Sequence, residues 1–439
     1  METYRFISSR FSNTIAHFFK RNTMQTSYTD LKEIQLQGRR QDLRTRTKEF
    51  LNITGGIAHT YFREVISPMD REVLVKDRQT GKVSKMLMFA SNNYLGFANH
   101  PYIREKVKKS IDDYGCGVGG PPLLNGYHKL IREAEERLAA WKKQEDAIIF
   151  SSGFTTNLGI ITGLSHSGDL IVFDELSHAS FYDGIKYSHA RSLSFTHNRM
   201  DEFQRLLEEH PARKGQTVFA SVEGVYSMDG DCAPLRKFAS TCRQYGAVSV
   251  VDDAHGSGVL GETGSGTAEA FGCTADIDIH MGTFSKAFAV SGGFAAAPRD
   301  IVNYLRYYAR PYFFSASFPP STAAAVIAAL DLLETEPWRR KQLLVNVAYT
   351  SSLIEHLGLY APAEAGFLTL KVPHGMNMRK AAMEFHRRNI FLNAIEYPAV
   401  PFDKQRFRIS LMATHTREDI RQLATAIEEI WANEAMFRL

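Results

Sequence analysis

The chain has 439 residues, of which 44% are hydrophobic and 23% charged, and its formal net charge is +4. This composition is typical of a soluble globular protein that buries one large α/β core with smaller appendages. The nearly balanced charge gives no reason to expect a nucleic-acid partner, and no apolar run approaches the roughly 18 residues of a membrane-spanning helix. The four cysteines have neither CxxC nor zinc-type spacing, so we expect reduced thiols in a cytoplasmic protein and no metal site.

The first twenty residues differ from this average. Apolar side chains recur there at helical spacing among basic ones: Tyr4, Ile7, Phe11, Ile15 and Phe18 among Arg5, Arg10, Lys20 and Arg21. Such an amphipathic helix can lie on an anionic membrane, which predicts peripheral membrane contact through residues 1–22. Two other roles stay open: a helix that packs on a neighbouring subunit, and a transit peptide, since only Glu2 is acidic.

Residues 1–89 are expected to form this arm and a small hairpin with its turn at 77–81. From there to residue 320, short apolar runs alternate with helical stretches. The predicted strands are 147–150, 170–173, 217–222, 248–251, 277–281 and 292–296. This alternation is typical of βαβ units and predicts a mainly parallel sheet with helices on both faces. Ligands bind such sheets at the carboxyl ends of the strands.

The pattern changes after Pro319 and Pro320. A helical stretch at 323–333 leads to predicted strands at 367–372, 390–394 and 407–412, and a helix at 417–431 follows. We therefore divide the chain into an N-terminal arm and hairpin (1–89), a large α/β domain (90–320) and a smaller α+β C-terminal domain (321–439).

One strand end favours phosphate binding. The strand at 147–150 runs into Ser151, Ser152 and Gly153 before a helix begins. Backbone N–H groups at the start of a helix bind phosphate. Many strand-to-helix turns contain Ser and Gly for geometry alone, so this segment carries little weight by itself.

Two further strand ends carry an acid and a lysine. Asp252 follows the strand at 248–251, with His255 three residues later. A carboxylate there can hold a cationic ring nitrogen, although an aspartate that caps the next turn is the ordinary alternative. Lys286 follows the strand at 277–281 among small and hydroxyl residues. A lysine in such surroundings can have a lowered pKa and form an imine.

In this order, phosphate loop, acid and lysine, the segments resemble those of the α-oxoamine synthases, fold-type I enzymes that use pyridoxal 5′-phosphate (PLP). The resemblance spans residues 45–433. Its motifs are 91–96 (SNNYLG), 176–180 (LSHAS), 223–230 (EGVYSMDG), 252–256 (DDAHG), 282–286 (GTFSK), 398–401 (PAVP) and Arg408. It implies the fold-type I PLP-dependent transferase fold, PLP as cofactor, and a homodimer with a shared active site.

The resemblance also implies a role for each motif residue. Lys286 holds PLP as a Schiff base, Asp252 pairs with the ring nitrogen, and His178 stacks on the ring, although outside this motif a core histidine would be favoured. The remaining cofactor contacts are Ser227 and His255 at the ring hydroxyl, Gly153, Phe154, Thr155, Thr283 and Ser285 at the phosphate, and Ser315 at the phosphate in the partner subunit.

The substrate carboxylate is assigned to Arg408, with Asn92 nearby. A guanidinium group can bind a carboxylate through two parallel hydrogen bonds. Arg406, two residues earlier, is a second candidate; we expect only one of these two arginines to bind the substrate, and we favour Arg408.

The implied reaction is a decarboxylative condensation. The amino acid displaces Lys286, the freed lysine takes the α-proton, the α-carbon attacks an acyl thioester, and loss of CO₂ leaves an α-amino ketone. Residues 124–126, 314–317 and 411–416 are most similar to bacterial serine palmitoyltransferases. Serine and a long-chain acyl thioester are therefore the favoured substrates.

Two departures leave the substrates open. Glu396 stands where some members have an arginine, and Pro121-Pro122 replaces a common Ser-Arg pair near the substrate end. Residues 395–398 resemble glycine-using members. The main alternative is a related synthase that uses glycine or alanine with a different acyl-CoA or acyl carrier protein. An aminotransferase and a silent partner subunit are less favoured, because the synthase motifs with Lys286 and Asp252 are retained.

Overall fold

The computed structural model describes residues 42–45, 47–48, 62–78, 80–396 and 399–433. The predicted amphipathic segment within residues 1–22 lies outside the described residues. In the hairpin, β2 (Glu72–Lys76) pairs with β3 (Val83–Met88) in antiparallel register. Hydrogen bonds from the Asp77 N–H to the Lys82 carbonyl and from the Gly81 N–H to the Asp77 carbonyl confirm the turn predicted at 77–81.

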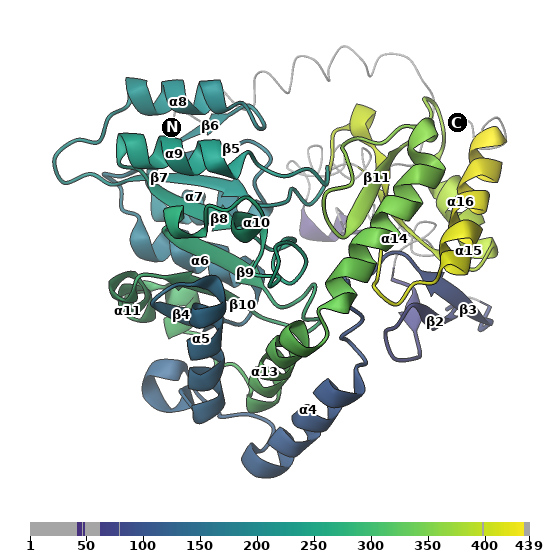
Figure 1. Ribbon diagram of the computed structural model, residues 1–439, viewed down its shortest axis with the longest axis horizontal. Coiled ribbons are helices and arrows are strands. Elements are labelled where there is room, and N and C mark those ends of the chain that lie inside the picture. The colour runs from purple at the N-terminus through teal and green to yellow at the C-terminus, as the bar shows by residue number, and fades with distance from the viewer. Residues whose placement is uncertain (1–41, 46, 49–61, 79, 397–398, 434–439) are drawn as a thin grey trace.

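A seven-stranded sheet forms the centre of the large domain (Figure 1). Its order is β4 (Asp146–Phe150), β10 (Gly293–Ala297), β9 (Ile279–Thr283), β8 (Val248–Asp252), β7 (Val218–Glu223), β5 (Leu170–Asp174) and β6 (Arg191–Phe195). The five strands from β9 to β6 are parallel, whereas β10 is antiparallel to both of its neighbours. The prediction of a mainly parallel sheet is confirmed, and β10 is its antiparallel exception.

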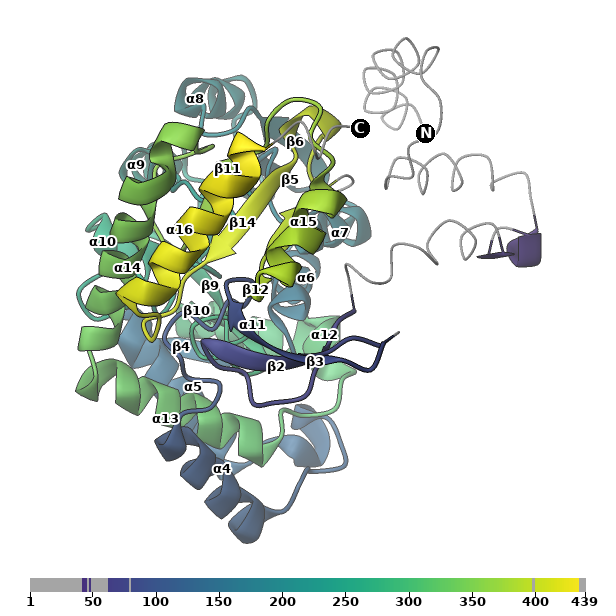
Figure 2. The ribbon, with the colours of Figure 1, turned by 90° about the vertical axis from the view of Figure 1, so that its right-hand side faces the viewer.

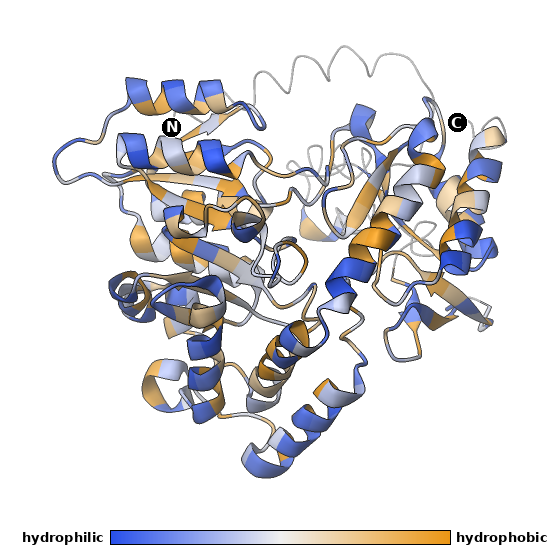
Figure 3. Ribbon diagram, in the orientation of Figure 1, coloured by the Kyte–Doolittle hydropathy of each residue, from blue (hydrophilic) through white to orange (hydrophobic). Residues whose placement is uncertain are grey.

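Helices cover both faces of this sheet, which explains why its inner strands are apolar throughout. Buried side chains of α6, α7 and α11 pack on one face, and those of α5, α8 and α9 on the other. The bounds are α5 (Lys129–Lys142), α6 (Gly153–Leu164), α7 (Ala179–Ser188), α8 (Met200–Glu209), α9 (Leu235–Tyr245) and α11 (Arg299–Tyr308). Apolar residues gather in the strands, and the outer faces of the helices are hydrophilic (Figure 3).

The C-terminal part contains a three-stranded antiparallel sheet of β11 (Phe367–Lys371), β14 (Arg406–Ser410) and β13 (Asn393–Ile395). Helices α14 (Trp338–Ile354), α15 (Met378–Arg387) and α16 (Arg417–Ala432) lie over it (Figure 2). The long helix α13 (Pro320–Thr335) packs against α4 (Pro101–Tyr114) and α5.

The strand predicted at 390–394 is in fact two short strands in different sheets. Leu392 separates β12 (Ile390–Phe391) from β13. Strand β12 pairs in parallel with β3 and completes a four-stranded sheet with β2 and β1 (Glu64–Val65). The hairpin is therefore joined to the C-terminal part by backbone hydrogen bonds.

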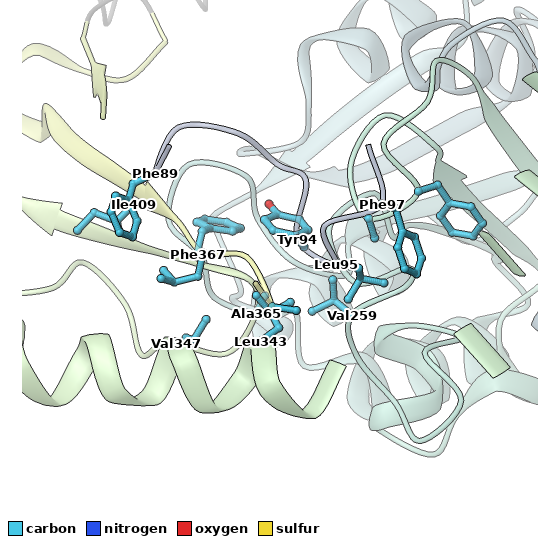
Figure 4. Packing of buried hydrophobic residues seen from close by; sticks show 14 of the residues in the cluster. Phe89, Tyr94, Leu95, Phe97, Val259, Leu343, Val347, Ala365, Phe367 and Ile409 are labelled. Atoms are coloured by element: carbon cyan, nitrogen blue, oxygen red, sulfur yellow. The ribbon is translucent and has the colours of Figure 1, made fainter. Parts of the chain in front are cut away.

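A buried cluster connects the two large parts of the molecule (Figure 4). Tyr94 and Leu95, from the loop after β3, lie between Val259 of the large domain and Phe367 of the C-terminal sheet. Arg408 on β14 is thereby brought to the carboxyl ends of the parallel strands.

Candidate active site

The predicted phosphate segment lies at the start of α6. Ser152 caps this helix, because its Oγ accepts the Thr155 N–H (3.1 Å) while Thr155 Oγ1 accepts the Ser152 N–H (3.0 Å). The first N–H groups, of Gly153 and Phe154, have no partner within the helix and can bind an anion. A Cβ atom on Gly153 would come within 2.8 Å of Thr283 Oγ1, so a larger residue does not fit.

Hydroxyl groups from β9 complete this end of the site. Thr283 Oγ1 lies 2.9 Å from Ser285 Oγ and donates to the Gly292 carbonyl (2.9 Å). The five residues predicted at the phosphate are thus brought together: Gly153, Phe154, Thr155, Thr283 and Ser285.

Asp252 is the last residue of β8 and is buried. Asn157 Nδ2 donates to its Oδ2 (2.7 Å) and to Ser180 Oγ (3.0 Å), which hydrogen-bonds in turn to His178 Nδ1 (2.7 Å). A chain of hydrogen bonds therefore fixes Asp252 relative to His178. Sequence reasoning missed Asn157 and Ser180.

His178 caps the N-terminus of α7. Its Nδ1 accepts the Ser180 N–H (3.2 Å), so the ring proton lies on Nε2. Burial lowers the pKa of His178, although Asp252 opposes this, and Lys286 lowers it further. His178 is therefore expected to be mainly neutral, and a neutral imidazole can stack on an aromatic ring.

His255 and Tyr94 form the other side of the site. The Tyr94 hydroxyl lies 2.8 Å from His255 Nδ1, and Arg408 Nη2 lies 3.5 Å from the same nitrogen. Because a guanidinium group only donates, Nδ1 is the acceptor, and the imidazole proton lies on Nε2. Burial and the nearby cations Lys286 and Arg408 place the pKa of His255 well below its usual value. His255 can therefore donate only from Nε2.

Arg408 on β14 is buried and binds the loop that carries Asn92. Its Nη2 donates to Asn92 Oδ1 (3.0 Å) and to the Tyr94 hydroxyl (3.1 Å), and its guanidinium carbon lies 4.1 Å from the centre of the Phe367 ring. Among the described residues no hydrogen-bond acceptor contacts its Nε. Arg408 therefore keeps a donor for a ligand.

Arg406 lies two residues from Arg408 on β14, and therefore on the same side of the strand, but it binds other partners. Its Nη1 donates to the Met228 carbonyl (2.7 Å) and to Asp229 Oδ1 (2.7 Å). Its guanidinium carbon lies 3.8 Å from the centre of the Tyr360 ring.

Lys286 lies three residues after β9 and is partly buried. Burial lowers its pKa to about 8; Asp252 and Glu223 oppose this change, and Arg408 adds to it. The neutral, nucleophilic form of this amine is therefore far more populated near neutral pH than in a lysine with an ordinary pKa.

Glu223 is a second buried carboxylate that sequence reasoning missed as a site residue. It ends β7 opposite Asp252 in the register of the sheet, and the Ser227 N–H donates to its Oε2 (3.3 Å). Within the described chain its Oε1 has no hydrogen-bond partner. Burial and the charge of Asp252 raise its pKa well above the usual value. A charged residue that ends an apolar strand was the available signal, as it was for Asp252.

Ser315 is placed differently from the other predicted residues. It lies in the bend after α12 (Arg310–Phe313), and no hydrogen bond among the described residues connects it with Lys286 or Asp252. The described part of the chain also contains no group of three or more His, Cys, Asp or Glu side chains that could hold a metal ion. None of its helices is long and apolar enough to cross a membrane.

Sequence comparisons agree on one family. A model described as "Aminotransferase class I and II" matches residues 84–427. The 8-amino-7-oxononanoate synthase of Geotalea daltonii is 39% identical over 367 residues, which cover 81% of this chain and 92% of that protein. The 8-amino-7-oxononanoate synthase 1 of Bacillus subtilis is 36% identical over 346 residues, or 79% and 88% of the two chains.

Solved structures share the fold. A structure of serine palmitoyltransferase with a PLP internal aldimine has a TM-score of 0.83 and 27% identity, and the match covers 90% of this chain and 100% of that one. The Sphingomonas wittichii serine palmitoyltransferase has a TM-score of 0.82 and 29% identity, with the same coverage of both chains. The 8-amino-7-oxononanoate synthase of Francisella tularensis has a TM-score of 0.68 and 25% identity, and the match covers 80% of this chain and 99% of that one. The predicted fold-type I fold and PLP as cofactor are confirmed.

The geometry fits this cofactor. The start of α6 offers free N–H groups and no room for a side chain at Gly153, as a phosphate requires. Buried Asp252 can balance a protonated ring nitrogen, and Lys286 offers an amine for the aldehyde.

Proposed function

Because the chain belongs to the aminotransferase class I and II family and, within it, to the PLP-dependent α-oxoamine synthases, we propose that it condenses a small amino acid with an acyl thioester. The products are an α-amino ketone, CO₂ and a free thiol. The observation that carries the proposal is the 39% identity to an 8-amino-7-oxononanoate synthase over 92% of its length.

Bound PLP supplies an electron sink for the bonds at the α-carbon of the amino acid. Asp252 would keep the pyridine nitrogen of this cofactor protonated, and His178 would lie against its ring. Arg408 and Asn92 hold the substrate carboxylate, and the Lys286 amine, once displaced, accepts the proton from the α-carbon. His255, with Tyr94 on its Nδ1, keeps Nε2–H as the donor that would bind the ring hydroxyl of the cofactor together with Ser227.

We propose alanine and a seven-carbon dicarboxylic acyl thioester as the first substrate pair. The name of the curated relatives describes a nine-carbon acid with a ketone at carbon 7 and an amine at carbon 8. In a decarboxylative condensation, alanine supplies carbons 8 and 9 with the amine. A heptanedioyl group supplies carbons 1–7 with the ketone. The substrate prediction of serine and a long acyl chain is thus less supported than its alternative.

Serine with a long-chain acyl thioester is the second candidate. The serine palmitoyltransferases overlay with TM-scores of 0.83 and 0.82, against 0.68 for the Francisella tularensis synthase. In addition, residues 119–126 contain no cationic side chain that could bind a terminal carboxylate of the acyl group.

A substrate matrix tests both candidates. Alanine, glycine and serine are each combined with heptanedioyl-, acetyl- and palmitoyl-CoA, and release of thiol and of CO₂ is measured. The first candidate predicts the highest kcat/KM for alanine with heptanedioyl-CoA, and the second for serine with palmitoyl-CoA. Amino-group transfer to a 2-oxo acid without thiol release would contradict both.

The proposal includes two further elements from the sequence. A homodimer in which Ser315 reaches the phosphate in the partner subunit is expected to show as twice the chain mass in light scattering. Peripheral membrane contact through residues 1–22 predicts liposome co-sedimentation that is lost when these residues are removed. A fully active monomer would contradict the shared active site. Unchanged co-sedimentation after the truncation would contradict membrane contact through residues 1–22.

A further inference from the structure

Glu135 on α5 is a buried carboxylate outside the site described above. Its side chain is 1% exposed, and three donors from different segments reach it. The Ile149 N–H donates to Oε1 (3.0 Å), and the Tyr127 hydroxyl (2.9 Å) and Arg306 Nη2 (3.1 Å) donate to Oε2. Burial raises its pKa to about 7, although Arg306 and Tyr127 oppose this.

The first donor fixes the strand that leads to the phosphate loop. Among the described strands, β4 is at the edge of the sheet and pairs with β10 alone, so alternate N–H and C=O groups of β4 face away from the sheet. Glu135 accepts one of these, the Ile149 N–H, and Arg306 Nη2 donates to another, the Ala147 carbonyl (3.1 Å). Because β4 ends at Phe150, this contact lies four residues before Gly153.

The second donor fixes the turn that holds the Ser315 bend. Tyr127 directly follows the short helix η2 (Pro122–Gly126). The Ser317 N–H donates to the Gly120 carbonyl (2.9 Å) and Ser317 Oγ to the Gly126 carbonyl (2.7 Å). A Cβ atom on Gly126 would lie 2.5 Å from Ser317 Cβ, so turn and bend are in close contact.

The third donor approaches the same bend from its other side. Arg306 belongs to α11, which leads into α12 and then Ser315, and it also binds Asp146 at the start of β4 (2.8 Å). Tyr312 of α12 meets the ring of Phe150 edge-on, with the ring centres 5.8 Å apart.

We infer that Glu135 is a positioning residue for the phosphate end of the cofactor site, because it joins β4, which carries the Gly153 loop, to both flanks of the Ser315 bend. This inference rests on the proposed role of these two segments at the phosphate. A purely structural role as a cap on the edge strand would affect the fold but not the phosphate in particular.

Glu135→Gln tests the inference. The amide keeps the size and can accept the Ile149 N–H, but its NH₂ group cannot accept a hydrogen bond from Tyr127 or Arg306. Glu136→Gln is the matched control, because Glu136 is the next residue of α5 and is exposed, paired with Arg132. Dissociation constants of the apo-protein for PLP and for pyridoxal, which lacks the phosphate, are measured at pH 8, with the ³¹P chemical shift of bound PLP.

We expect Glu135→Gln to weaken PLP binding roughly fivefold to tenfold, to leave pyridoxal within twofold, and to shift the ³¹P signal, since a charge-assisted hydrogen bond is lost. Tyr127→Phe removes one donor, keeps the carboxylate, and is expected to act in the same direction by about twofold to threefold. If the affinities for PLP and pyridoxal fall equally, or if neither changes, the inference is overturned. The same criterion applies to Tyr127→Phe alone if Glu135→Gln does not fold.

Gly153→Ala separates this inference from its premise. The added methyl group should weaken PLP but not pyridoxal, because the phosphate loop is crowded by Thr283. An effect at Gly153 without one at Glu135 overturns the Glu135 role alone. No effect at Gly153 overturns the phosphate assignment and the Glu135 role with it. Neither outcome depends on which amino acid or thioester the enzyme condenses.

Discussion

Two aspartates that are neighbours in the chain have opposite surroundings. Asp252 faces the site, where Asn157 donates to its carboxylate and where its charge acts on Lys286 and His178. Asp253 points to the rear of the same loop.

On the side that faces away from the site, both carboxylate oxygens of Asp253 accept hydrogen bonds. Lys142 Nζ (3.1 Å) and Ser257 Oγ (3.2 Å) donate to Asp253 Oδ2, and the Thr267 hydroxyl donates to Oδ1 (2.6 Å). Lys142 and Asp253 are 1% and 2% exposed, so this is a fully buried ion pair.

The arginines of β14 repeat the contrast. Arg406 is bound by Met228, Asp229 and the ring of Tyr360, whereas Arg408 keeps its Nε without a partner among the described residues. In the described chain, Arg408 Nε and Glu223 Oε1 of the site are buried without a hydrogen-bond partner, whereas no buried side-chain atom of Asp253 or Arg406 lacks one. A buried polar atom left in this way is available to a ligand. Four predictions and a final measurement test this separation.

Lys286→Ala gives the largest expected effect on activity. Without this amine, the protein forms no covalent bond with PLP, and the α-proton of the amino acid has no acceptor. General-base contributions suggest a loss of roughly 10²–10⁴-fold in kcat, measured as thiol release. Borohydride treatment should fix PLP to the wild type and not to the variant. A reducible PLP–lysine bond in Lys286→Ala would disprove the assignment.

Asp253→Asn should reduce stability rather than chemistry. Breaking a buried pair costs about 3–5 kcal/mol, because the Lys142 charge loses its partner. Denaturant unfolding of the apo-protein measures this loss. The double variant Lys142→Met/Asp253→Asn should be less destabilised than the sum of the single variants. A loss of activity in folded Asp253→Asn without a loss of stability would contradict the proposed separation.

Arg408→Ala should raise the amino-acid KM by about tenfold to a hundredfold, because a charge-assisted hydrogen bond contributes roughly 1.5–3 kcal/mol. The KM of the acyl thioester should change less. Arg406→Ala is the matched control: it should lower the free energy of unfolding and leave the amino-acid KM unchanged. If the two variants exchange these phenotypes, Arg406 and not Arg408 binds the substrate carboxylate.

The lowered pKa of Lys286 predicts the pH dependence of cofactor capture. Below about pH 8 the ammonium form dominates and cannot attack an aldehyde. The rate of covalent capture of pyridoxal by the apo-protein should therefore rise about tenfold per pH unit up to pH 8 and then level off. Stopped-flow absorbance measures this rate. A rise that continues to pH 10 would show a lysine with an ordinary pKa.

The sequence was sufficient for much of the fold and for the local part of the site. Lys286, Asp252 and His255 lie at the end of an apolar strand or within the short turn that follows it, so their place at the carboxyl ends of the sheet follows from pattern alone. Strand β6 was not predicted, because it is an exposed edge strand with the sequence RSLSF and no apolar run.

Contacts between distant segments were not predictable in the same way. Tyr94 is separated from His255 by 161 residues, and Asn157 from Asp252 by 95. A single sequence contains no signal that pairs them, since a buried tyrosine is usually part of the core. Glu223 was missed although its position resembles that of Asp252, because a single acidic residue at the end of a strand can equally cap the following turn.

The separation of the two aspartates is tested most directly by proton exchange at the α-carbon of alanine in D₂O, followed by NMR without an acyl donor. In Asp252→Asn we predict exchange at least about 10²-fold slower than in the wild type, because loss of a buried charge partner costs about 3–5 kcal/mol. In folded Asp253→Asn, the rate of α-proton exchange should stay within a few-fold of the wild-type rate. Exchange in Asp252→Asn within a few-fold of the wild type would contradict the account.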